Sequence, residues 1–125
     1  MAINGFEDQT HELSDYEKAN VLPLFLKGIS KKVGVDLAIT NKEIVTALKL
    51  KGIKTTDSRI RKIVNYVRTE GLVPGLIATS KGYYISNDPV EIAKYVDSLN
   101  QRAKEILRVK ESFRSHLCTL LKQAS

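Results

Sequence analysis

The sequence has one cysteine among its 125 residues and no long apolar run. A single thiol, Cys118, cannot form an internal disulfide and is typical of a reducing compartment, so we expect a cytoplasmic protein. No stretch approaches the roughly 18 consecutive apolar residues of a membrane span, which predicts no membrane partner. The N-terminal residues also lack the basic start and apolar run of a secretory signal.

Motifs of enzymes and metalloproteins are missing as well. The sequence contains no glycine-rich phosphate loop, nucleophile elbow or HExxH motif. His116 and Cys118 lie close together, but His11 is far away in the sequence, and a zinc site needs three or four ligands. The acidic residues near the expected helix ends are better explained as caps and first-turn acids. We therefore expect no enzyme, no metal and no cofactor.

Charge is distributed unevenly along the chain. Hydrophobic residues make up 42% of the sequence, enough for the packed core of one domain, and the net charge is +6. Residues 41–86 hold nine basic and three acidic side chains, whereas residues 1–40 are net acidic. A localised basic segment is what a polyanion-binding face needs, because neutralised phosphates release counterions. A solvated basic surface explains the charge equally well.

Capping signals predict three helices before residue 71. Ser14 and Glu17 have the spacing of a capping box, and the following helix must kink or restart at Pro23 before it ends near Gly34. A second box at residues 40–43 starts a short helix that ends near residue 52. The third helix covers about residues 56–70 and is amphipathic, with one apolar face made of Ile60, Ile63, Val64 and Val67.

The sequence after residue 71 predicts a hairpin and one long helix. Residues 76–79 and 83–86 are short β-prone runs, separated by a three-residue loop that ends in Gly82. Asp88 and Pro89 form a strong helix start, and nothing interrupts the helix before residue 122.

The order helix, helix, turn, helix, hairpin resembles the winged helix-turn-helix superfamily, in particular small phage, mobile-element and bacterial members. The resemblance is clearest in the run RIRKIVNYVR, followed by GLI and SKGYYI. It implies a mainly α fold with a small β-hairpin wing (α+β). The expected parts are a flexible arm at 1–12, a DNA-binding domain at 13–88 and a long C-terminal helix at 89–125.

The third helix is the expected recognition helix. Opposite its apolar face lies a polar face with basic flanks, whose Lys, Arg and Asn side chains have the donors and acceptors that read base edges or hold phosphates. The N-terminal N–H groups of the helix add a phosphate site. Double-stranded DNA is thus the expected partner, through Thr55, Thr56, Ser58, Arg59, Arg61, Lys62, Asn65 and Thr69. Every surface helix has polar residues on its outer face, so a face that contacts only solvent remains the alternative.

The wing, residues 76–86, is the second expected contact with DNA. Thr79, Ser80 and Lys81 are placed at its tip, where they reach a phosphate or the minor groove, unless Lys81 is only a solvated turn residue. Tyr83 and Tyr84 alternate in a strand. We expect one in the core and the other against the sugar-phosphate backbone, or, as a weaker alternative, stacked on a single-stranded base.

The apolar residues of the last helix repeat as a heptad. Its seam consists of Ile92, Val96, Leu99, Ala103, Ile106, Phe113, Leu117 and Leu120, with Lys110 as the one polar seam position. This pattern predicts self-association as a coiled coil, and a homodimer suits a protein that reads two half-sites. Leu107, Val109 and Leu121 widen the seam, which leaves packing on the chain's own domain as the alternative.

These features indicate a transcription regulator or an accessory factor of a phage or mobile element. A winged helix also serves as a protein interaction module without DNA binding, in replication or assembly, and fold alone does not distinguish the two. The module would hold its protein partner through the last helix.

Overall fold

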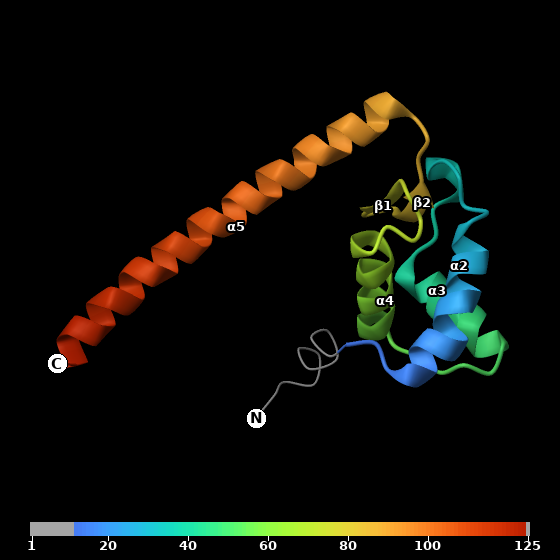
Figure 1. The fold of residues 1–125 in the computed structure, drawn as a ribbon, viewed down its shortest axis with the longest axis horizontal. Coiled ribbons are helices and arrows are strands. Elements are labelled where there is room, and N and C mark those ends of the chain that lie inside the picture. The colour runs from blue at the N-terminus through green and yellow to red at the C-terminus, as the bar shows by residue number, and fades with distance from the viewer. Residues whose placement is uncertain (1–11, 125) are drawn as a thin grey trace. The chain divides into compact units, whose positions relative to one another are not determined.

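The computed structural model describes residues 12–124, which form two compact units that divide between Asn87 and Asp88 (Figure 1). The fold is mainly helical with one small antiparallel hairpin and a long C-terminal helix, as the α+β prediction requires. Of the arm expected at residues 1–12, all but Glu12 lies outside the described residues. The elements are η1 (Glu17–Val21), α2 (Leu22–Ile29), η2 (Val35–Leu37), α3 (Asn41–Leu50), α4 (Asp57–Thr69), β1 (Leu76–Thr79), β2 (Gly82–Ile85) and α5 (Pro89–Ala124).

The first helical region restarts at Pro23, as predicted. The Ser14–Glu17 capping box forms, with the Glu17 backbone N–H donating to Ser14 Oγ and the Ser14 N–H donating to Glu17 Oε1. The next turn, η1, is a π-helix, and α2 begins with Pro23 in its first turn. Proline has no N–H to donate to the carbonyl four residues earlier, which explains the change of helical register. The region ends at Ile29, earlier than the expected Gly34.

Both later caps also match the sequence. Thr40 and Glu43 form a complete capping box at the start of α3. Thr56 caps α4 by accepting a hydrogen bond from the Arg59 backbone N–H at 3.2 Å. These caps satisfy N–H groups that the helices themselves leave unpaired, and they determine where each helix begins.

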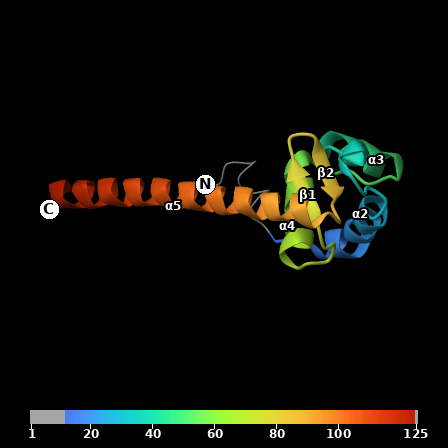
Figure 2. The same cartoon turned by 90° about the horizontal axis from the view of Figure 1, so that it is seen from above.

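A connection between α2 and α3 extends the hairpin on its β2 edge. The Ile39 and Tyr83 backbones exchange hydrogen bonds of 3.0 and 2.8 Å. Farther along, Ile85 N–H donates to the Lys32 carbonyl and Gly34 N–H donates to the Ile85 carbonyl. This connection places α3 beside the hairpin, with α2 and α3 next to α4 (Figures 1 and 2).

The tip of the hairpin is tighter than predicted. Gly82 pairs with Thr79, so the turn contains two residues, Ser80 and Lys81, where the sequence suggested three. Gly82 has φ +118°, and a Cβ built there would lie 2.5 Å from the Ile39 carbonyl oxygen. Glycine is therefore required at this position both by the backbone conformation and by the close approach of the connection.

The Gly82→Ala variant is expected to lose about 2–3 kcal/mol of unfolding free energy, because it combines an unfavourable φ with a backbone clash. Gly52→Ala is the matched control for φ alone: Gly52 has φ +81° but open space around its Cα. Gly28→Ala, in α2 and also in open space, is expected to be neutral or stabilising. Urea unfolding of the three variants would contradict this account if Gly52→Ala cost as much as Gly82→Ala.

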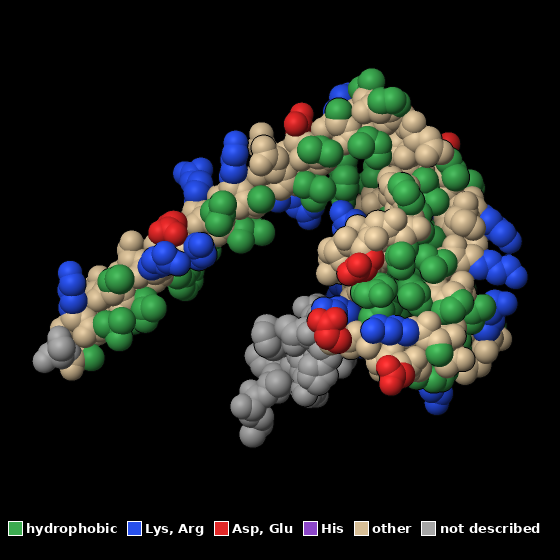
Figure 3. All heavy atoms as spheres, viewed as in Figure 1, with side chains coloured by type: hydrophobic (Ala, Val, Ile, Leu, Met, Phe, Trp, Pro, Cys, Tyr) green, Lys and Arg blue, Asp and Glu red, His purple; other side chains and the backbone are tan. Residues whose placement is uncertain are grey.

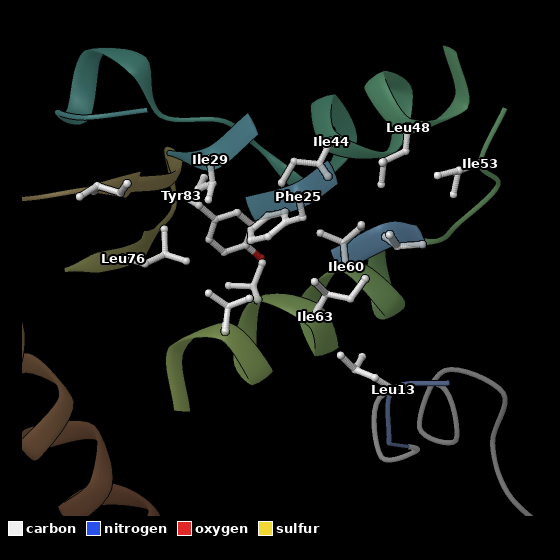
Figure 4. Packing of buried hydrophobic residues seen from close by; sticks show 14 residues of the cluster. Leu13, Phe25, Ile29, Ile44, Leu48, Ile53, Ile60, Ile63, Leu76 and Tyr83 are labelled. Atoms are coloured by element: carbon white, nitrogen blue, oxygen red, sulfur yellow. The ribbon is translucent and has the colours of Figure 1, made fainter. Parts of the chain in front are cut away.

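The core of the first unit lies between α2, α3, α4 and the hairpin (Figure 4). Phe25 and Ile29 of α2, with Ile44 and Leu48 of α3, face the apolar side of α4. Leu76, Tyr83 and Ile85 of the hairpin close the same cluster. This packing covers the apolar face of α4 and leaves the opposite face outside the core.

The second unit is one uninterrupted helix, α5. None of its described residues is buried, and its apolar side chains gather along one side, visible as the lower edge of the helix in Figure 3. Within residues 12–124, no helix is both long and apolar enough to cross a membrane.

Candidate nucleic-acid interface

Helix α4 has two faces of different chemistry. Ile60, Ile63 and Val67 are completely buried, and Val64 is 2% exposed, as the 3.6-residue period predicted. The opposite face carries Arg61, Asn65 and Thr69 in exposed positions, with Ser58 and Lys62 half-buried beside them. The buried face anchors the helix, and the outer face lies on the surface of the unit.

Three side chains of this outer face, Arg61, Lys62 and Asn65, have no partner inside the described chain. Within residues 12–124, none of the three makes a side-chain hydrogen bond or an ion pair. Arg61 and Asn65 are four residues apart and therefore neighbours on the helix surface, as are Lys62 and Asn65 at three. The group presents two cations and an amide, a set that can bind phosphates and base edges.

Arg59 does not belong to this face, although the sequence placed it among the DNA contacts. Its Nε donates to Glu17 Oε2 at 2.9 Å, and its Nη2 pairs with Glu17 Oε1 and donates to the Glu12 carbonyl at 3.2 Å. Only 16% of the Arg59 side chain is exposed. Arg59 instead joins α4 to the start of η1, because position 59 lies on the flank of the helix that faces Glu17.

The remaining predicted residues of α4 and its preceding turn have mixed roles. The Thr56 hydroxyl is used as the N-cap, and the Thr69 hydroxyl donates to the Tyr66 carbonyl at 3.3 Å. Thr55 and Ser58 are half-buried beside the helix N-terminus. Arg68 was left out of the predicted contacts, but it follows Arg61 and Asn65 at helical spacing, and its charge acts on Tyr83. Its spacing of seven residues from Arg61 could have indicated that the two side chains share one side of the helix.

In the hairpin, two of the three predicted residues are available for contact. Ser80 and Lys81 form the exposed turn. The Thr79 hydroxyl instead closes that turn, since it donates to the Gly82 carbonyl and accepts from the Lys81 N–H, both at 3.2 Å. Thr79 thus positions Lys81 by shaping the turn.

Both hairpin tyrosines are buried, which corrects the expectation that one would face DNA. Tyr83 is 8% exposed and its hydroxyl donates to Asn41 Oδ1 at 2.7 Å, linking β2 to the start of α3. Tyr84 is 5% exposed and lies opposite Ile77 across the hairpin, itself buried. This burial argues against stacking on a single-stranded base.

Burial raises the pKa of the Tyr83 phenol, while its hydrogen bond to Asn41 and the charges of Arg61 and Arg68 act in the opposite direction. A raised pKa means that the folded state disfavours the phenolate. The contribution of Tyr83 to stability is then present below about pH 10 and lost as the pH rises through its folded pKa.

Tyr83→Phe is accordingly expected to lose about 0.5–1.5 kcal/mol at pH 7, from the missing hydrogen bond, and to unfold with a weaker pH dependence above pH 10. Urea unfolding of both proteins between pH 7 and pH 11 measures the difference. Parallel pH profiles would contradict the raised pKa.

A second group of basic side chains lies over α2 and α3, along the right-hand edge of Figure 3. Lys42 and Lys49 of α3, and Lys51 and Lys54 in the segment that follows it, are all exposed. Near them, α2 and α3 enclose an apolar groove of about 340 Å³, bordered by Lys31, Lys32 and Lys51. The positive charge of the first unit therefore extends beyond α4.

No protein family model, curated protein or solved structure matches this chain. In residues 12–124, no three His, Cys, Asp or Glu side chains are grouped so that they can hold a metal ion. The site is thus defined by its own geometry: a helix anchored on its apolar side, with unpaired cations and an amide outward and a lysine-tipped hairpin in the same unit.

Proposed function

We propose that this chain binds double-stranded DNA in the cytoplasm as a winged-helix protein, with α4 in the major groove and the β1–β2 turn on the backbone or in the minor groove. The observation that carries the proposal is the outer group of α4, Arg61, Lys62 and Asn65, which has no partner in the described part of the chain and lies on a helix whose other face is buried. Cations without internal partners are available to phosphates at no cost in broken ion pairs. A role as transcription regulator or phage or mobile-element accessory factor, acting as a dimer, fits this activity.

The test is titration of a random-sequence 30-mer duplex from low to physiological salt, for the wild type and for Arg61→Ala/Lys62→Ala. Each lost phosphate contact reduces the salt slope by about 0.9, so the double variant is expected to lose about 1.8 of that slope and between about 10-fold and 100-fold in affinity. Lys94→Ala/Arg108→Ala removes the same charge from exposed positions of α5 and is the matched control. If both double variants lost the same affinity and salt slope, the effect would come from net charge alone and would contradict a specific role of α4.

The alternative is a protein interaction module that does not bind DNA. The observation that favours it is the exposure of Phe113, Leu117 and Leu120 on α5, between 47% and 70%. Capture of a protein through these side chains would persist at high salt, whereas duplex binding would weaken steeply. A folded protein with no duplex affinity at low salt would favour this alternative.

A further inference from the structure

From Val96 to Leu120 the apolar side of α5 is an exposed stripe in the described part of the chain, interrupted only by Lys110, while Ile92 at its start is half-buried. Val96, Leu99, Ile106 and Phe113 are between 38% and 70% exposed, and Leu117 and Leu120 continue the stripe toward the end of the helix. Stripes of this length on one helix are covered by another helix when their residues repeat as a heptad. The inference below rests on the self-association included in the proposed function, and adds the orientation and register of the two helices.

The positions of the heptad identify which residues would meet. Val96, Ala103, Lys110 and Leu117 occupy position a, whereas Ile92, Leu99, Ile106, Phe113 and Leu120 occupy position d. In a parallel pair each residue meets its own copy, whereas in an antiparallel pair each a residue meets a d residue of the other chain. The two orientations therefore make different demands on the same side chains.

A parallel pair matches this sequence poorly. It places the two Lys110 ammonium groups in one layer, two alanines at position 103 in another and two phenylalanines at position 113 in a third. The first layer is repulsive, the second underfilled and the third crowded. The flanking pairs also mismatch, because Leu107 meets Arg102 and Val109 meets Arg114 of the other chain.

We infer that α5 pairs with α5 of a second copy as an antiparallel two-stranded coiled coil, with the two-fold axis at the level of Arg108. Each seam residue then faces the seam residue equally far on the other side of Arg108, whereas a flanking residue at heptad position e meets position e of the second copy and one at position g meets position g. The small Ala103 meets the large Phe113 of the second copy, Leu99 meets Leu117, and Val96 meets Leu120. Lys110 meets Ile106, so that the two lysines are in separate layers and each stem covers an apolar neighbour.

The flanking residues support the same register. Beside the axis, Leu107 meets Leu107 of the second copy on one flank, and Val109 meets Val109 on the other. Leu121 meets Ala93. The apolar side chains that widened the seam are thus paired with apolar ones. The register also uses nearly the whole helix, since Ile92 meets Ala124, the last residue of α5.

This arrangement separates the two N-terminal units. Pro89, the first residue of α5, precedes Arg108 by 19 residues. At about 1.5 Å per residue, the two α5 N-termini are about 57 Å apart along the rod, whereas a parallel pair would place them side by side. The predicted dimer therefore attaches its two DNA-binding units at opposite ends, farther apart than the roughly 34 Å between half-sites one helical turn apart.

The orientation can be measured from spin labels on the full chain, because Cys118 is the only cysteine and is exposed. The second labelling site is Ser98, exposed and as far from Arg108 as Cys118, used as Ser98→Cys/Cys118→Ser. Pulsed dipolar spectroscopy is recorded on each labelled protein alone and on a mixture refolded together. Sedimentation equilibrium reports the oligomeric state, and circular dichroism checks folding.

Each protein alone is expected to give the same distance, above about 30 Å, because its labels lie ten residues on either side of the axis. The mixture is expected to add a second distance near 20 Å, where position 98 of one chain lies level with position 118 of the other. The reverse pattern would overturn the antiparallel orientation: a short distance in each protein measured by itself and an added long distance in the mixture. Unequal distances for the two single samples would overturn the register.

A monomer without dipolar distances would overturn the inference together with the proposed self-association. It would leave duplex binding by α4 standing, since the 30-mer titration tests that activity separately. A trimer or larger assembly in sedimentation would overturn the two-stranded arrangement.

Discussion

Replacing Arg59 with alanine is expected to lower the free energy of unfolding by about 2–3 kcal/mol. The substitution leaves the Glu17 carboxylate, only 12% exposed, without its main cationic partner. Breaking a buried pair costs about 3–5 kcal/mol, and the partial exposure of this pair reduces that figure. Urea unfolding of wild type, Arg59→Ala, Glu17→Ala and the double variant would give the coupling energy.

The same pair predicts an acid-dependent term in stability. Hydrogen bonding and charge from Arg59, together with the Ser14 backbone N–H, hold the Glu17 pKa below 4.5 against the opposing effect of burial. A lowered pKa contributes stability above the unfolded value and loses it as the pH falls through the folded value. The difference between wild type and Arg59→Ala should therefore shrink below about pH 4.5.

Duplex binding distinguishes this structural role from the one that the sequence suggested. With Arg59 facing Glu17, folded Arg59→Ala is expected to keep the wild-type salt slope, unlike Arg61→Ala/Lys62→Ala. A slope reduced by about 0.9 in Arg59→Ala would instead return Arg59 to the DNA contacts.

Replacing Ile63 with alanine is expected to cost about 3–4 kcal/mol, the largest effect among these substitutions. Ile63 is completely buried and belongs to the core cluster, where Figure 4 shows it on α4 beside Ile60. Truncation removes buried methyl groups and leaves a cavity that the surrounding helices fill only in part. Leu50→Ala, at 86% exposure on α3, is the control and is expected to change stability by less than about 0.5 kcal/mol.

Urea unfolding measures both variants. Similar losses of unfolding free energy for Ile63→Ala and Leu50→Ala would contradict the placement of the core. Because the core anchors α4, the Ile63→Ala variant should also lose duplex affinity at temperatures where it is partly unfolded, and regain it on cooling.

Local features of the chain could be predicted accurately. The three caps at Ser14, Thr40 and Thr56, the restart at Pro23 and the apolar face of α4 each depend on residues within one or two turns. A cap or a 3.6-residue period is an interaction between near neighbours in sequence. Such an interaction can therefore be predicted without knowing the rest of the fold.

Features that depend on distant residues could not be predicted in the same way. Residues 32–39 pair with β2, but their sequence shows no alternation of apolar and polar residues, because the paired segment is short and interrupted by η2. The burial of both Tyr83 and Tyr84 requires cover on both faces of the hairpin, whereas strand alternation suggested cover on one. The position of Arg59 depends on Glu17, 42 residues earlier.

The sequence alone determined the α-helices and the hairpin of this protein, their order, the apolar side of each helix and the concentration of basic residues between 41 and 86. Only the tertiary structure decided which basic residues of α4 remain available, since Arg59 has an ionic partner and Arg61 and Lys62 have none among residues 12–124. The reason is geometric: sequence spacing assigns a residue to a side of its helix. Its partners depend on which other element packs against that side.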